Sequence, residues 1–124
     1  MESALTLLAL FTLLFAIAEF SRAYHMYQVL VNAAREGSRF AVAPDPATAV
    51  LPSTTAIQER VQLFLTSGGI RNPTVTVDAA KEMQVNGINT RFTEIEVAAP
   101  FDPFFFPFDT VTISARAEMR NETN

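Results

Sequence analysis

The feature that most constrains this chain is an apolar run close to its N-terminus. No residue from Ser3 to Ala18 is charged, and polar sequence follows without a break from Glu19 and Arg22 onward. A helix that is hydrophobic on all sides needs burial on all sides, in lipid or among other protein segments. Three interpretations therefore arise: a secretory signal peptide, a simple transmembrane anchor, or the first half of a longer helix.

Two of these interpretations treat the run as a separate segment. A signal peptide is favoured by the small-x-small triplet Ala16-Ile17-Ala18, although acidic Glu2 stands where signal peptides carry a basic cluster. A membrane anchor is feasible because sixteen uncharged residues approach the ~20 that cross a bilayer as a helix. Glu2 is a poor cytoplasmic flank for such an anchor, since these flanks usually carry Lys or Arg.

The third interpretation follows from the periodicity beyond the run. An apolar stripe at spacings of four and three residues consists of Ala23, Tyr27, Leu30, Ala34, Gly37 and Ala41. A polar stripe half a turn away consists of Ser21, His25, Gln28, Asn32, Arg35 and Arg39. Together they predict one helix from about Glu2 to about Val42, apolar all round at first and amphipathic later. Pro44 and Pro46 end it, and at ~1.5 Å per residue it measures roughly 60 Å.

The rest of the chain predicts a short helix and a small sheet. The segment "TTAIQERVQLFLTSGG" has capping-box spacing at Thr55 and Gln58 and is closed by Gly68-Gly69. Its apolar face consists of Ile57, Val61 and Leu65, with Phe64 beside them. Three alternating segments, at 73–79, 90–98 and 109–119, predict antiparallel strands with one covered face, and Asn86-Gly87 predicts a turn. The apolar strand residues are Val75, Val77, Ile95, Val97, Val111, Ile113, Ala115 and Ala117, with Thr93 on the same side.

These elements predict an α+β, ladle-shaped molecule. Residues 1–22 form a hydrophobic helical stem, and residues 23–124 form a globular head that includes the amphipathic half of the long helix. We expect that half and the short helix to cover the apolar face of the sheet. The stem is then buried in the membrane or among the stems of identical neighbours.

Composition argues against several classes of function. The chain has 124 residues, enough for one small domain, a net charge of −4 and no cysteine. The basic patch expected of a nucleic-acid-binding protein is missing. We find no nucleophile–base pair, no cluster of metal-ligating residues and no Gly-rich phosphate loop, so we predict neither enzyme activity nor a cofactor.

The N-terminal region resembles the TadE-like pilins and pseudopilins of tight-adherence (Tad) type IV pilus systems. The resemblance is carried by acidic Glu2 at the start of the apolar helix, by Glu19-Phe20, and by the "NAAREG" stretch at 32–37. The closing "ISARAEMRNE" resembles the last strand of the family. Family members usually carry a basic leader that ends in Gly and is removed by a prepilin peptidase. The sequence begins directly with Met1 and Glu2, so we expect Met1 to be the processed N-terminus.

The resemblance implies a structural pilin that waits in the inner membrane and polymerises into an extracellular adhesive filament. Its partners would be copies of itself, the inner membrane, prepilin peptidase and the pilus assembly machinery. Two alternatives stay open. One is a minor TadE-like pseudopilin that primes or tips the fibre, and the other is a single-pass membrane-anchored binding protein of the cell envelope.

Candidate assembly residues lie in two regions. In the stem they are Glu2, Leu7, Leu10, Phe11, Leu14, Phe15, Glu19 and Arg22. We expect Glu2 to neutralise a terminal ammonium, because a buried charge is costly unless it is paired. Glu19 and Arg22 are three residues apart on a helix, so they can pair within one chain or bridge two chains.

The second region is the aromatic segment "FDPFFFPFD" at 101–109, here called the Phe loop. Pro100, Pro103 and Pro107 forbid a regular helix or a central strand across it. A loop cannot easily bury five large rings beneath itself, and rings left in water favour a binding surface. The alternative is a loop folded over the end of the sheet with its rings inside. We expect a mixture, with at least two of the five rings at a contact between subunits, and Phe104, Phe105 or Phe106 buried against a neighbour.

Overall fold

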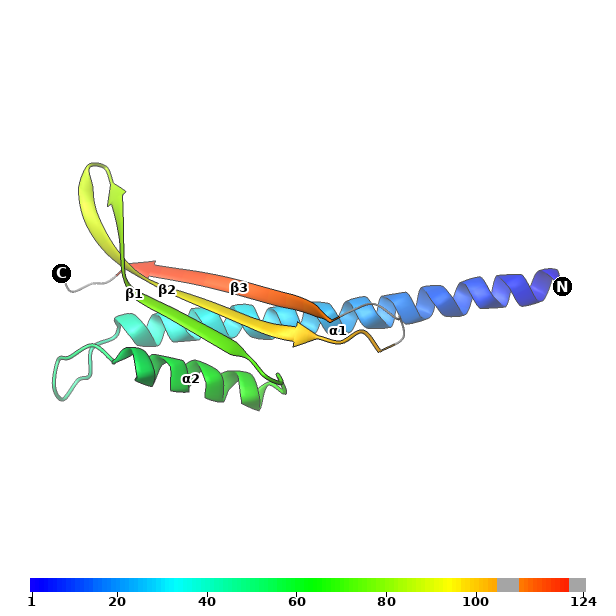
Figure 1. The fold of residues 1–124 in the computed structure, drawn as a ribbon, viewed down its shortest axis with the longest axis horizontal. Coiled ribbons are helices and arrows are strands. Elements are labelled where there is room, and N and C mark those ends of the chain that lie inside the picture. Colours follow the sequence, from blue (N-terminus) through cyan, green and yellow to red (C-terminus); the bar gives the residue numbers. More distant parts are fainter. Residues whose placement is uncertain (105–109, 121–124) are drawn as a thin grey trace.

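A computed structural model describes residues 1–104 and 110–120 of the chain (Figure 1). The elements are α1 (Glu2–Val42), α2 (Thr54–Ser67), β1 (Thr74–Val85), β2 (Ile88–Phe101) and β3 (Val111–Arg120). The α+β architecture predicted from the sequence, with a long N-terminal helix, a short second helix and a small antiparallel sheet, is confirmed.

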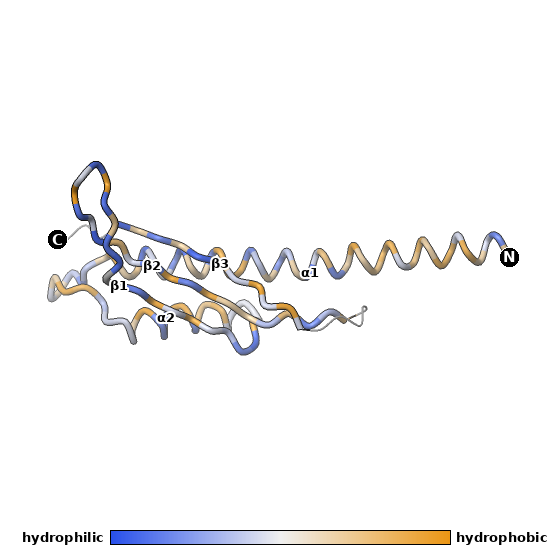
Figure 2. Tube along the Cα trace, turned by 45° about the horizontal axis from the view of Figure 1, so that its top comes forward, coloured by the Kyte–Doolittle hydropathy of each residue, from blue (hydrophilic) through white to orange (hydrophobic). Residues whose placement is uncertain are grey.

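Helix α1 is continuous over 41 residues and ends where the sequence predicts. Ala43 leaves the helical conformation with ψ of 114°, as expected for a residue that precedes proline. The N-terminal part of α1 extends well beyond the sheet (Figure 1), and hydrophobic residues predominate along this extension (Figure 2). The molecule therefore has the predicted ladle shape.

The sheet has the order β1-β2-β3, with both pairs antiparallel. Strand β3 packs on α1, β1 packs on α2, and the central strand β2 contacts α1 from its place between the other two. The two helices lie side by side on one face of the sheet (Figure 1). This arrangement encloses a core between the layer of two helices and the sheet.

The buried core is built from both helices and from the two strands β2 and β3. Its members are Met26, Leu30, Ala33, Ala34, Ala41, Ile57, Val61, Leu65, Ile95, Val97, Ala99 and Ala115. Gly37 lies at the centre of this packing, because a Cβ placed there would be 2.4 Å from Val61 Cγ2 and 2.9 Å from Ile95 Cδ1. The small residues of α1 thus let α2 and β2 approach closely.

The structure corrects the predicted apolar stripe of α1. Tyr27 was placed on the covered face, but it is 44% exposed. The buried face is instead centred on Leu30 and Ala34 and includes Met26 and Ser38. It is wider and rotated because two layers, α2 and the sheet, cover α1 from different directions. Every member of the predicted polar stripe is exposed, as expected.

The N-terminal cap of α2 differs from the prediction, whereas its C-terminal end agrees with it. The N-terminal cap is Ser53, whose Oγ accepts a hydrogen bond from the Ala56 N–H at 3.2 Å, and the expected Thr55–Gln58 capping box is wrong. The C-terminal end is confirmed. Gly69 has φ of 81°, and the N–H groups of Gly69 and Ile70 donate to the carbonyls of Thr66 and Leu65. This is the Schellman arrangement that favours glycine.

The strands are longer than the alternating segments predict. Asn86 and Gly87, with φ of 53° and 81°, form the predicted two-residue turn between Val85 and Ile88. The hairpin that they close extends beyond the helices and curls away from them (Figure 1). At the other end of the sheet, Val111 was expected on the covered face but is exposed, because β3 begins beyond the core.

Candidate functional site

The first part of the candidate site is the free extension of α1. The five predicted stem residues Leu7, Leu10, Phe11, Leu14 and Phe15 are between 42% and 52% exposed. They and the neighbouring apolar residues cover every side of the helix, and Phe11 stacks on Phe15 with 6.5 Å between ring centroids. Helix α1 is long and apolar enough to cross a membrane. Within one chain, this surface has no covering layer among the described residues.

Three hydroxyl groups on the stem or at its end form hydrogen bonds within the helix itself. The hydroxyl groups of Thr6, Thr12 and Ser21 donate to the carbonyls of Glu2, Leu8 and Ile17, at 3.0, 2.8 and 2.8 Å. A hydroxyl that is bonded within its own helix can enter lipid without leaving an unsatisfied donor. Thr6 and Thr12, which lie between Glu2 and Glu19, are therefore compatible with hydrocarbon.

The second part of the site is the point where the extension meets the head. Glu19 is only 6% exposed, although the adjacent residues Ala18 and Phe20 are exposed in the single chain. Its carboxylate accepts two hydrogen bonds from Arg22 Nη1, at 3.1 and 3.2 Å, and one from the Phe104 backbone N–H at 2.7 Å. Glu19 and Arg22 therefore pair within one chain, and a bridge between two chains stays a prediction.

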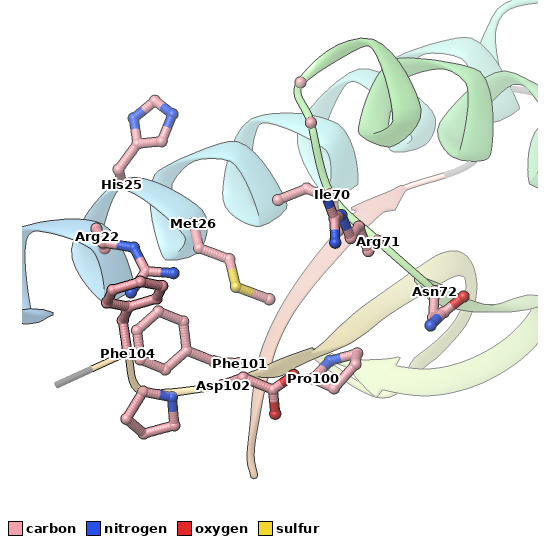
Figure 3. Close-up of a pocket in the computed structure, with 13 residues that line it drawn as sticks. Arg22, His25, Met26, Ile70, Arg71, Asn72, Pro100, Phe101, Asp102 and Phe104 are labelled. Carbon is pink, nitrogen blue, oxygen red and sulfur yellow. The ribbon is translucent and has the colours of Figure 1, made fainter. Parts of the chain in front are cut away.

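Arg22 joins this carboxylate to the described part of the Phe loop. Its guanidinium lies over the Phe101 ring, 5.3 Å from the centroid, and 5.9 Å from the centroid of the Phe104 ring. These are cation–π distances. Figure 3 shows Arg22 above both rings, with Met26 extending beside them into the cavity and His25 pointing away. The loop is therefore held to α1 by charge, by a main-chain hydrogen bond and by aromatic contact.

A cavity of about 720 Å³ opens beside this junction. Its walls come from α1, from the connection between α2 and β1, and from the end of β2 with the start of the Phe loop (Figure 3). Arg22, Met26, Ile70, Arg71 and Phe101 are among its lining residues. No group of three His, Asp or Glu residues that could hold a metal occurs in the described part of the chain. The lining combines apolar and aromatic side chains with the two arginines.

The structure brings together some of the predicted assembly residues and separates others. Glu19, Arg22 and Phe104 meet at the junction, whereas Glu2 lies at the first turn of α1, at the far end of the molecule. Phe105 and Phe106 lie outside the described residues. Phe104 is 77% exposed. Its contact with a neighbouring subunit stays a prediction.

Sequence reasoning did not select Phe101 as a site residue. Phe101 is the last residue of β2, and its partly buried ring packs against the core and beneath Arg22. The signal in the sequence was its place between Pro100 and Pro103, where a strand must end. That signal locates the residue at a strand terminus, but it does not reveal a partner on α1.

The outer face of the sheet carries a charged network. Register places Asp78, Glu94 and Glu118 side by side across the three strands. Lys81 pairs with Glu94 and with Glu118, the latter at 2.7 Å, and Arg116 pairs with Glu94 at 3.1 Å. The hydrogen bond from Lys81 lowers the pKa of Glu118, and the bonds to Glu118 and Glu94 raise the pKa of Lys81. The network offsets repulsion between acids that face each other.

Fold and site together define a class: a small α+β protein anchored through a long, apolar N-terminal helix. The model of one family, TadE-like protein, matches residues 1–39, so the resemblance noted in the sequence is confirmed over that segment. This match and the apolar helix fit a membrane-anchored protein associated with a Tad pilus. Comparison with curated proteins and with solved structures gave no match.

Proposed function

We propose that this chain is a pilin subunit that polymerises through its N-terminal helix into an extracellular Tad-like filament. Residues 1–22 are the stem and residues 23–124 are the head. The role is structural rather than catalytic. Before assembly the subunit stands in the inner membrane, where prepilin peptidase and the pilus assembly machinery act on it, and after assembly it forms part of a fibre at the cell surface.

The observation that carries this proposal is the uncovered extension of α1. A helix that is apolar on every side must be covered on every side, and the head covers only the half of α1 that begins at Glu19. Lipid covers the extension in the membrane, and neighbouring stems cover it in a fibre. Because stems and lipid tails are similarly apolar, the exchange is driven by close packing between helices rather than by exclusion of water.

Glu2 is the charged side chain that this exchange must accommodate at the N-terminal end of the stem. It lies in the first turn of α1, where a carboxylate also suits the positive end of the helix dipole. In a bundle of stems we expect it to pair with a terminal ammonium, of its own chain or of a neighbour. Leu7, Leu10, Phe11, Leu14 and Phe15 supply the apolar contacts above it.

The head offers exposed apolar groups at two opposite ends, which supports a polymer. One is Phe104, beside the stem, and the other is the tip of the β1–β2 hairpin, with Met83, Val85 and Ile88 exposed. A contact between two different surfaces of identical subunits propagates as a helix when it does not close into a ring. Such a contact would bury Phe104, and Phe105 and Phe106 of the same loop are proposed to join it.

The cavity beside Arg22 is the observation that favours the anchored binding protein. The Arg22 guanidinium is already engaged by Glu19 and by two aromatic rings, which leaves less of it for a ligand. The filament proposal therefore explains more features of the molecule than the anchored binding protein does.

The test is immunogold microscopy of sheared surface fibres, with antibodies against the head. Continuous labelling along the fibre is the expected result for a major pilin. Labelling at fibre ends alone would identify a minor pseudopilin. Fibres without label, together with label confined to the membrane, would contradict the proposal and favour the anchored binding protein.

A further inference from the structure

We propose that, while α1 crosses the membrane, the ring of Phe104 is inserted in the interfacial layer of the bilayer beside the stem. The proposed partner is the lipid surface itself, at the junction of hydrocarbon and headgroups. This inference rests on the membrane stage of the proposed function. It adds a second lipid contact, made by the head, to the contact made by the stem.

The depth of Phe104 follows from its attachment to Glu19. The rise from Glu2 to Glu19 is about 25 Å at ~1.5 Å per residue, close to the ~30 Å of a hydrocarbon core. Glu19 thus lies where hydrocarbon gives way to headgroups. The Phe104 N–H donates to the Glu19 carboxylate at 2.7 Å, so the start of the Phe loop lies at the same depth.

The chemistry at this depth matches a membrane interface. Phe104 is 77% exposed, and on another side of α1 Phe20 and Tyr24 are also exposed and stack with 6.4 Å between ring centroids. Aromatic residues gather at the level of the headgroups in membrane proteins. Aromatic rings therefore surround α1 on more than one side where it would leave the hydrocarbon, although none of them is needed to fill the core.

The charges at the junction are compatible with this position. Glu19 is neutralised by Arg22 and bonded by a main-chain N–H, so it can approach hydrocarbon at reduced cost. Half of the Arg22 side chain is exposed and can extend towards phosphate groups. Asp102 is exposed and accepts a hydrogen bond from Thr110 at 2.5 Å, so it stays in the hydrated headgroup layer and limits how deep Phe104 enters.

The chain contains no tryptophan, so a single introduced indole reports its own surroundings. The full chain with Phe104→Trp is reconstituted at low density in phosphatidylcholine vesicles and probed with lipids brominated at different depths. We expect a blue-shifted emission that is quenched more strongly by bromines near the headgroups than by bromines near the chain ends. The matched control, Ile88→Trp, lies at the exposed hairpin tip and should show water-exposed emission without quenching.

A third variant separates this inference from the proposed function. Phe11→Trp lies in the middle of the stem and should be quenched most by deep bromines. If Phe11→Trp is quenched and Phe104→Trp is not, the stem crosses the bilayer but the inference is wrong. If neither is quenched, the membrane stage itself fails. A blue shift of Phe104→Trp that grows with protein density, without lipid quenching, would assign the ring to a neighbouring copy and overturn the inference.

Discussion

Glu19 stands at the boundary between the apolar and amphipathic halves of α1, where an unpaired buried carboxylate would be costly. Three hydrogen bonds, two from Arg22 and one from the Phe104 main chain, reduce that cost. The same bonds fix the start of the Phe loop against the helix. Glu19 therefore serves two purposes. It is a tolerated charge where α1 passes from its apolar to its amphipathic half, and it positions the start of the Phe loop.

Removal of this carboxylate should weaken the head. Glu19→Ala leaves the Phe104 N–H and the Arg22 guanidinium without their partner, and hydrogen bonds to charged groups contribute about 1.5–3 kcal/mol. We expect a fall of that order in the free energy of unfolding, measured by denaturant titration in detergent. Glu19→Gln keeps an acceptor for the N–H and should lose less. The control Glu59→Ala, on the exposed face of α2, should change little, and equal losses in the two alanine variants would contradict the role assigned to Glu19.

Gly37 illustrates a second residue-scale constraint, the absence of a side chain. In Gly37→Ala the new Cβ meets Val61 and Ile95, which are both buried. Overpacking of a core costs about 1–3 kcal/mol, and the better helix propensity of Ala returns about 1 kcal/mol. We expect a net loss of roughly 1 kcal/mol.

Calorimetry of Gly37→Ala, beside Asn32→Ala on the exposed face of the same helix, measures this loss. The exposed variant should be neutral or slightly more stable. Addition of Val61→Ala should cost less in the Gly37→Ala background than in the parent chain, because the two substitutions share the same space. If the stability losses of Gly37→Ala and Val61→Ala are strictly additive, the contact between the new Cβ and Val61 is not the cause of the loss.

At the scale of elements, the outer face of the sheet depends on Lys81. A register shift between Asp78 and Lys81 adds one residue to β1 relative to β2. Because strand side chains alternate between the two faces of a sheet, the extra residue changes which residues of β1 lie on the outer face beyond the bulge. Lys81 therefore shares the outer face with Glu94 and Glu118, which it bridges.

The pKa shifts of this network predict how stability depends on pH. The lowered pKa of Glu118 stabilises the fold above its unfolded value of about 4.5, and this contribution is lost as pH falls through the folded pKa. The raised pKa of Lys81 stabilises the fold below its unfolded value of about 10.5, and this contribution is lost as pH rises through the folded pKa. Lys81→Met should lower the melting temperature at neutral pH and flatten its decline in acid. Arg91→Met, at an exposed pair in the hairpin, serves as the control, and an unchanged acid profile for Lys81→Met would refute the assignment.

Elements were predicted well where the signal is local. The bounds of α1 follow from its periodicity and from Pro44, and the hairpin turn follows from Asn86-Gly87. The exposure of Tyr27 was missed because it depends on the direction from which α2 and the sheet cover α1. The spacing of apolar residues in a helix predicts the width of its buried face only when the elements that pack on the helix are known.

The site was predicted in part for the same reason. The apolar stem and the Glu19–Arg22 pair lie within one helix, so sequence spacing is enough to propose them. The hydrogen bond from Phe104 to Glu19 joins residues 85 positions apart, and no periodicity encodes such a contact. The bulge before Lys81 was missed as well, because it interrupts the alternation that strand prediction uses.

At the scale of the whole molecule, the apolar extension of α1 needs other molecules to cover it, whereas the head has a core of its own. All members of the core lie at or beyond Met26, so the packing of the head makes no use of the extension. In the proposed filament the extension is covered by other copies, while the head folds from its own residues. The boundary between the two parts is therefore open to a direct test by truncation.

Two truncations should give soluble, folded heads that differ in stability. A chain of residues 23–124 keeps the core and should retain its sheet, but it lacks Glu19 and Arg22 and so loses its attachment to Phe104. A chain of residues 19–124 keeps that attachment. We expect the longer head to be more stable by an amount similar to the Glu19→Ala effect, about 1.5–3 kcal/mol, in denaturant titrations followed by circular dichroism. Glu19→Ala in the longer head should remove most of the difference. If residues 23–124 are unfolded, the division at residue 22 is wrong and the junction belongs to the core of the head.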